Sequence, residues 1–244
     1  NHISFDVRSG EICGLIGENG SGKSTVSSII AGIQSATSGT MVYEGKPWAP
    51  STILEAQQAG ITMIVQEAGT IPNITVAENI FLGNERKFSS GPFVSQAKMN
   101  RAADQLLSDL GITELRGDMP TRSLDIQSRK LVEVAKAMYW KPKLFIVDET
   151  TTALSQRGRT LVYELMKKLT AQGSAVLFIS HDLDELMEQC DTLTVLRDGN
   201  IVGTLERSQF EGNLIKQMMV GRELKDNYYR VDMDGYGEEV VLRA

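Results

Sequence analysis

Four short apolar segments of the chain end in small or polar residues. They are residues 11–17, 61–67, 143–149 and 175–182, which read EICGLIG, ITMIVQE, KLFIVDE and AVLFISHD. Such segments are typical of strands buried on both faces of a largely parallel sheet, and the stretches between them are expected to be helices. We therefore predict an α/β fold with the functional residues gathered where the strands end.

Two other segments alternate around a turn signal. Residues 39–47 carry Glu44-Gly45 and residues 193–205 carry Asp198-Gly199-Asn200, each between alternating side chains. This pattern predicts antiparallel β hairpins. We expect one to form a small appendage and the other to supply the late strands of the core.

The pattern turns helical from about residue 75 to 138. Its last helix has Leu131, Val134, Ala135 and Met138 on one face, at the spacing of an amphipathic helix. The block interrupts the series of apolar segments. It therefore indicates a helical subdomain inserted into the α/β core.

The composition of the chain limits its possible partners and the cellular compartment in which it works. The 244-residue chain has a net charge of −6, which disfavours a nucleic-acid partner bound through a general basic field. Cys13 and Cys190 lie in apolar segments, which favours buried thiols in a reducing compartment over a disulfide. The chain contains no run of about 18 uncharged apolar residues, so any role at a membrane would require docking.

A phosphate-binding motif follows the first apolar segment. Gly17 to Ser24 reads G-x-x-x-x-G-K-S and lies between a predicted strand and a predicted helix. Its glycines let backbone amides face phosphates, Lys23 would reach the β and γ phosphates, and Ser24 would ligate Mg²⁺. An ordinary glycine turn is the alternative. The candidate ATP-binding residues are Gly17, Glu18, Asn19, Gly20, Ser21, Gly22, Lys23, Ser24 and Thr25.

Two acids end the third apolar segment. An ionised carboxylate at the end of a buried strand is costly unless a cation balances it, so Asp148 fits a partner of Mg²⁺. Glu149 fits the general base that orients the attacking water. The alternative is a strand that ends in two surface acids. The long interval between Lys23 and Asp148 sets the chain apart from a minimal P-loop domain.

In combination and in order, these motifs resemble the nucleotide-binding domain of ATP-binding cassette (ABC) proteins, from about residue 3 to 224. The Walker A motif is matched by GENGSGKST and the Walker B motif by LFIVDE. The Q-loop is matched by VQE, which contains Gln66, and the D-loop by TALS. The switch histidine is matched by His181 in FISHD. A narrower resemblance, to the first cassette of sugar-importer ATPases, is carried by four segments: IPNITVAENIFLG, LVEVAKAM, CDTLTVLRDGNIVG and MVGREL. Such ATPases typically carry two cassettes in one chain.

The resemblance implies a P-loop NTPase, RecA-like core at residues 1–66 and 136–226, a helical subdomain at 67–135 and a linker towards a second cassette at 227–244. Gln66 would sense the γ phosphate and Mg²⁺ and relay to the helical lobe, and His181 would contact the γ phosphate. Taken alone, each could instead be an ordinary surface or structural residue. Thr150 stands where the family usually has proline, and the aromatic residue that usually stacks on adenine is absent, so we expect weak base binding.

The implied function is ATP hydrolysis that powers import of a sugar or similar solute. The implied partners are a second nucleotide-binding cassette, membrane permease subunits and, indirectly, a solute-binding protein, at the cytoplasmic face of the membrane and without nucleic acid. An ATP-dependent dimerising regulatory module with little hydrolysis is the main alternative. A soluble ABC protein acting on ribosomes or DNA is disfavoured by the acidic charge.

The signature motif departs from the family pattern. Where LSGGQ is usual, Leu124 remains, Asp125 replaces the serine, Ile126 and Gln127 fill the glycine positions, and Ser128 comes last. Two unit negative charges about 4 Å apart repel by roughly 4 kcal/mol at an effective dielectric near 20. The carboxylate of Asp125 therefore opposes the binding of a phosphate at this position. Its carboxylate is instead suited to cap the helix by accepting from the backbone N–H of Gln127 or Ser128.

We therefore hypothesise two unequal composite sites. The signature of this chain would complete a slow or non-hydrolytic site. Its Walker A, Glu149 and His181 would complete a competent site with the signature of a partner cassette. A single cassette would then hydrolyse ATP slowly and be monomeric.

Overall fold

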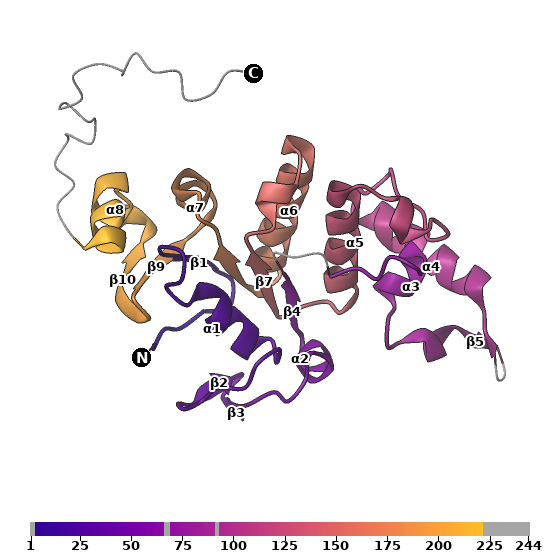
Figure 1. Cartoon of the computed structure of the whole chain (residues 1–244), viewed down its shortest axis with the longest axis horizontal. Helices are drawn as coiled ribbons and strands as arrows, with labels where there is room; N and C mark the ends of the chain where they lie inside the picture. Colours follow the sequence, from indigo (N-terminus) through magenta and orange to yellow (C-terminus); the bar gives the residue numbers. More distant parts are fainter. Residues whose placement is uncertain (1–2, 66–68, 91–92, 222–244) are drawn as a thin grey trace, which may run out of the picture.

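A six-stranded sheet forms the centre of the chain (Figure 1). The structure is a computed structural model that describes residues 3–65, 69–90 and 93–221. The strand order is β10-β9-β1-β8-β7-β4, and all neighbours are parallel except β9 and β10. This confirms the mostly parallel α/β fold. The strands are β1 Ile12–Ile16, β4 Ile61–Ile64, β7 Leu144–Asp148, β8 Ala175–Ile179, β9 Thr192–Arg197 and β10 Asn200–Glu206.

Helices cover both faces of this sheet, as continuous apolar strands require. In Figure 1, α1 and α2 lie on one side, with the small β2–β3 hairpin, and α6, α7 and α8 lie on the other. Their bounds are α1 Lys23–Ile30, β2 Met41–Tyr43, β3 Lys46–Trp48, α2 Ile53–Ala59, α6 Gln156–Ala171, α7 Leu183–Gln189 and α8 Gly212–Val220. Short 3₁₀ turns occupy Glu85–Phe88, Thr121–Ser123, Thr151–Ala153 and Arg207–Gln209.

Alternate residues of the strands supply two separate cores. On β7, Phe145 and Val147 join the core beneath α6, α7 and α8, whereas Leu144 and Ile146 join the core beneath α1 and α2. The period of two residues in a strand produces this division. Asp148 continues the second series and so lies on the α1 side of the sheet.

The helical block lies beyond β4 at one end of the sheet (Figure 1). It contains α3 Val76–Ile80, β5 Ser89–Ser90, β6 Phe93–Val94, α4 Gln96–Asp109 and α5 Ile126–Tyr139. Leu131, Val134 and Ala135 of α5 are buried and Met138 packs against the same core, as their spacing predicts. The pair β5–β6 was not predicted, because strands of two residues carry no periodic signal.

Both predicted hairpins are present. Asp198 and Gly199 have φ values of 50° and 71° between β9 and β10, and Glu44 and Gly45 have φ values of 49° and 76° between β2 and β3. Positive φ at both central residues matches the right-handed twist of the strands. The two cysteines are free and buried, also as predicted.

Candidate functional site

The described candidates for ATP binding and catalysis lie along the carboxyl edge of the sheet. Because β1, β8, β7 and β4 are parallel neighbours, the residues that follow them lie along one edge. Gly17 follows β1, His181 comes two residues after β8, and Asp148 ends β7. Gln66, predicted at the end of β4, lies outside the described residues, which reach Val65 there.

The phosphate loop has the backbone that its glycines predict. A Cβ on Gly17 would lie 2.0 Å from the Leu196 carbonyl oxygen, so no other residue fits there. Gly20 and Gly22 have φ values of 80° and 107°, which favour glycine. Gly22 precedes α1, and no side-chain hydrogen bond caps this helix in the described part of the chain. The partly positive helix end is thus directed into the loop.

Lys23 places a positive charge inside this loop. Its side chain is 5% exposed, and its Nζ donates to the carbonyl oxygens of Gly17 at 2.8 Å and Glu18 at 3.1 Å. Both of these acceptors are neutral carbonyl oxygens and not carboxylates. The loop, the start of α1 and Lys23 thus have the arrangement that binding a phosphate would require.

Asp148 is buried beside the start of α1. It is 2% exposed and one of its oxygens accepts from Ser27 Oγ at 3.0 Å. Burial raises its pKa, as does Glu149, while the hydrogen bond from Ser27, the nearby Ser24 hydroxyl and the charge of Lys23 lower it. Its other oxygen, Oδ1, is buried without a hydrogen-bond partner among the described residues.

This unpartnered oxygen tests the fit of the site for Mg²⁺. A buried acceptor without a partner is costly, and a cation would satisfy it. Ser24, which was predicted as a ligand together with Gln66 and Asp148, has its hydroxyl near the Asp148 carboxyl group. Carboxylate and hydroxyl oxygens are hard ligands of the kind that Mg²⁺ takes. The residues present therefore fit the ion. Ser27 was not predicted, although it lies one helical turn after Ser24.

Glu149 and His181 lie at the ends of the neighbouring strands β7 and β8. Glu149 has left-handed backbone, with φ of 46°, and its N–H donates to the Ile179 carbonyl at 2.9 Å. Its side chain is partly exposed and His181 is exposed. Thr150, at the usual proline position, is buried and its hydroxyl donates to the Asp148 carbonyl at 3.0 Å. These bonds orient the chain just after β7.

The signature segment lies elsewhere, at the start of α5. Asp125 caps the helix as predicted, accepting from Ser128 N–H at 2.7 Å, and this bond lowers the pKa of its carboxyl group. Arg129 donates to the Leu124 carbonyl at 3.0 Å. Gln127 accepts from Ser155 N–H at 3.2 Å, and Ile126 is 71% exposed. Helix α5 packs beside β4, and the strands β7 and β8 lie between β4 and β1, the strand that precedes the phosphate loop.

Removing this cap should lower stability. Asp125→Ala is expected to reduce the free energy of unfolding by about 1 kcal/mol at pH 7, as is usual for loss of an N-cap. Because the folded pKa is lowered, this contribution is lost as pH falls through that pKa. Urea denaturation measures the effect. Asp118→Ala, which removes an exposed ion pair with Arg116, is the control and should cost less. Equal losses for both variants would refute the cap.

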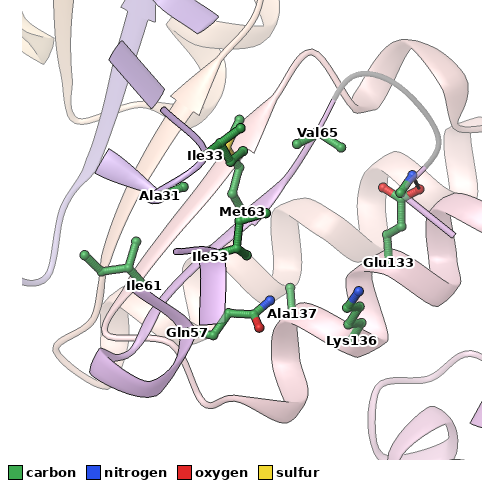
Figure 2. A pocket seen from close by; sticks show the side chains of 11 residues that line it. Ala31, Ile33, Ile53, Gln57, Ile61, Met63, Val65, Glu133, Lys136 and Ala137 are labelled. Atoms are coloured by element: carbon green, nitrogen blue, oxygen red, sulfur yellow. Dashed lines mark hydrogen bonds between the residues drawn. The ribbon is translucent and has the colours of Figure 1, made fainter. Parts of the chain in front are cut away.

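A pocket of about 150 Å³ opens between α2, β4 and α5 (Figure 2). Its lining residues are Ala31, Ile33, Ile53, Gln57, Ile61, Met63, Val65, Gly69, Glu133, Lys136 and Ala137. Most of them are apolar, and Ile33 and Ile53 are 41% and 48% exposed. Glu133 and Lys136 line the pocket from α5 (Figure 2). Apolar side chains thus remain open to solvent near the end of β4.

A buried ion pair includes one residue that lines this pocket, Glu133. Lys130 and Glu133 of α5 are 3.0 Å apart, with side chains 3% and 6% exposed. Lys130 Nζ donates to the Val65 carbonyl and Glu133 accepts from Gly69 N–H at 2.7 Å. Burial raises the pKa of Glu133, and Lys130 partly offsets this. The pair was not predicted. A lysine three residues before a glutamate in an otherwise apolar helix was the available signal.

The fold and the edge site define a nucleotide-binding protein of the P-loop class. No helix in the described ranges has both the length and the apolar character needed to cross a membrane. Residues 1–152 match the family model described as "ABC transporter". The chain belongs to this family of ATPases.

Similar proteins agree with this assignment. The chain is 41% identical to the ribose import ATP-binding protein RbsA of Yersinia pestis over 92% of its own length and 44% of that protein. It is 39% identical to the xylose import ATP-binding protein XylG of Brucella abortus, over 95% of its length and 45% of the relative. The chain thus spans less than half the length of these relatives.

Solved structures share the fold. One ATP-binding cassette of an ABC transporter is 26% identical, with a TM-score of 0.73 and 90% of each chain covered. A nucleotide-free cassette has a TM-score of 0.72 at 24% identity, covering 90% of this chain and 88% of the other. The sequence-based assignment to ABC cassettes is therefore confirmed.

Proposed function

We propose that the chain is the ATP-hydrolysing cassette of an importer that takes up a sugar or similar small solute through a separate permease. The buried carboxylate of Asp148 is the observation that carries the catalytic part, because its unpartnered oxygen lies beside Ser24 and in the field of Lys23. The names of the ribose and xylose import relatives support the importer part.

In the proposed reaction, the amides of the loop from Gly17 and the ammonium of Lys23 hold the phosphates of ATP. Ser24 and Asp148, with Gln66, would hold Mg²⁺, which neutralises phosphate charge when bound. Glu149 accepts a proton from water as the water oxygen attacks the γ phosphorus and the bond to the ADP oxygen breaks. His181 contacts the γ phosphate from the neighbouring strand.

The proposed transporter has two cassettes, which form two unequal composite ATP sites. The start of α5 lies across the sheet from the phosphate loop, so this chain would need a partner's signature to cover its ATP. Its own signature is poorly suited to bind phosphate, since Asp125 occupies the Ser128 N–H and a side chain projects at both glycine positions. We place the ATP-binding core at residues 1–66 and 136–226, the helical subdomain at 67–135 and a linker at 227–244.

We propose that the pocket between α2, β4 and α5 receives a cytoplasmic segment of the permease, with the cassette peripheral at that face of the membrane. Exposed Ile33 and Ile53 supply apolar surface for such a segment. Glu133 lines the pocket and also bonds to Gly69, so the segment would contact α5 and the end of β4 together.

Uptake by the reconstituted transporter tests this proposal. The full-length protein, its permease and its solute-binding protein are placed in vesicles, and ATP-dependent accumulation of labelled ribose and xylose is measured. Accumulation of either sugar is expected, and Lys23→Ala should abolish it by weakening ATP binding. ATP turnover without accumulation of any small solute would contradict the importer. Nucleotide-dependent dimerisation with negligible turnover would support the regulatory module instead.

A further inference from the structure

The backbone on both sides of His181 is tied to a buried network. Ser180 is completely buried, and its hydroxyl donates to Glu185 Oε2 at 2.6 Å and accepts from Asp182 N–H at 3.0 Å. The Asp182 carboxylate in turn accepts from the N–H groups of Asp184 at 3.0 Å and Glu185 at 3.2 Å. The exposed His181 thus lies between two anchored neighbours.

Glu185 links this turn to α6. Its side chain is buried, and its second carboxylate oxygen, Oε1, accepts from the hydroxyl of Tyr163. The Tyr163 ring packs edge-on against Phe178 of β8, with centroids 6.3 Å apart. Burial and the Glu185 carboxylate raise the pKa of Tyr163, so this hydroxyl remains a donor. One carboxylate therefore receives bonds from two elements.

The same helix α6 is fixed to the chain that follows Glu149. Ser155 caps α6, accepting from Gly158 N–H at 3.4 Å, and Arg159 Nε donates to the Thr151 carbonyl at 3.0 Å. The Thr152 hydroxyl donates to the Glu149 carbonyl at 2.9 Å. Helix α6 thus connects the segment after Glu149, through Tyr163, to the turn that contains His181.

We propose that Tyr163 and Glu185 are positioning residues that hold His181 in a fixed position relative to Glu149. They act through Ser180 and through α6, not by contact with ATP. The proposal rests on the proposed role of His181 in ATP hydrolysis. A purely structural reading is that the network only stabilises the packing of α6 and α7.

Tyr163→Phe separates these readings, because it removes one hydrogen bond and leaves the ring. In the assembled full-length protein, the kcat for ATP is expected to fall roughly tenfold, since small displacements of a reacting group are costly, with KM changed less than about twofold. Tyr43→Phe is the matched control, because the Tyr43 hydroxyl also donates one hydrogen bond, to the Ala59 carbonyl at 3.2 Å, far from the site. It should lose somewhat less stability, because its acceptor is a neutral carbonyl and not a carboxylate, and it should keep its kcat. An unchanged kcat in Tyr163→Phe would overturn the proposal.

A double variant adds a second readout. If Tyr163 acts through His181, adding Tyr163→Phe to His181→Ala should cause no further loss of kcat. A further tenfold loss would show that Tyr163 does not act through His181 and would overturn the proposal. Full activity of His181→Ala alone would instead refute the role of His181 itself, and so the two failures are distinguishable.

Discussion

Glu149→Gln is expected to lower ATP turnover of the assembled full-length protein at least 100-fold while ATP still binds. A general base contributes about 10² to 10⁴ in rate, and the amide of glutamine cannot accept the proton from water. The substitution keeps the size of the side chain, and the phosphate loop and Lys23 are untouched. Phosphate release and titration calorimetry with ATP measure the two effects.

An exposed glutamate elsewhere in the chain provides a control for the charge removed by Glu149→Gln. Glu164 is exposed on α6, so Glu164→Gln removes the same charge without touching the edge site and should leave turnover unchanged. Wild-type turnover in Glu149→Gln would refute Glu149 as the base. Loss of ATP binding in that variant would mean that it disturbs the phosphate site and would refute the separation of roles.

Lys130→Met should be strongly destabilising, lowering the free energy of unfolding by about 3–5 kcal/mol at neutral pH. It removes the cation paired with the buried Glu133 carboxylate and leaves only the charge of Lys136 and the Gly69 N–H to offset it. A poorly compensated buried charge is costly. Lys130→Met with Glu133→Met removes both charges and should return stability close to wild type. Urea unfolding measures all three proteins. Lys143→Met breaks an exposed pair with Glu44 and should cost less than about 1 kcal/mol.

The loss should also depend on pH. The folded pKa of Glu133 is raised above its ordinary value, so the folded state binds more protons and stability falls as pH rises through that window. Lys130 lowers this pKa, and its removal raises it further. The Lys130→Met defect should therefore be smaller at pH 5 than at pH 8. A defect independent of pH, or an equally unstable double variant, would refute the buried-charge explanation.

Features with a local or periodic signal were predictable from the sequence. The buried strands, both hairpins and the Asp125 cap depend on residues within a few positions of one another. The phosphate loop was predictable because glycine spacing and Lys23 form one continuous motif. That the residues at the strand ends share one edge of the sheet then followed from the parallel strands, whereas their order along it was not predicted.

Contacts between distant segments were not predictable. Ser27 reaches Asp148, and Tyr163 reaches Glu185, only after the helices pack on the sheet. The Lys130–Glu133 pair is local, but its bonds to Val65 and Gly69 depend on how α5 packs beside β4. No pattern of hydrophobic positions specifies such polar pairings. The roles of Gln66, Glu149, His181 and the signature remain predictions.

The asymmetry of the two composite sites is tested most directly by ATP turnover of the assembled transporter carrying Asp125→Ala, measured beside Glu149→Gln. If this chain's Glu149 acts in the competent site and its signature in the slow one, Asp125→Ala should retain near wild-type turnover and Glu149→Gln should fall to background. Loss of turnover in Asp125→Ala, at a temperature where the variant remains folded, would contradict the asymmetric pair.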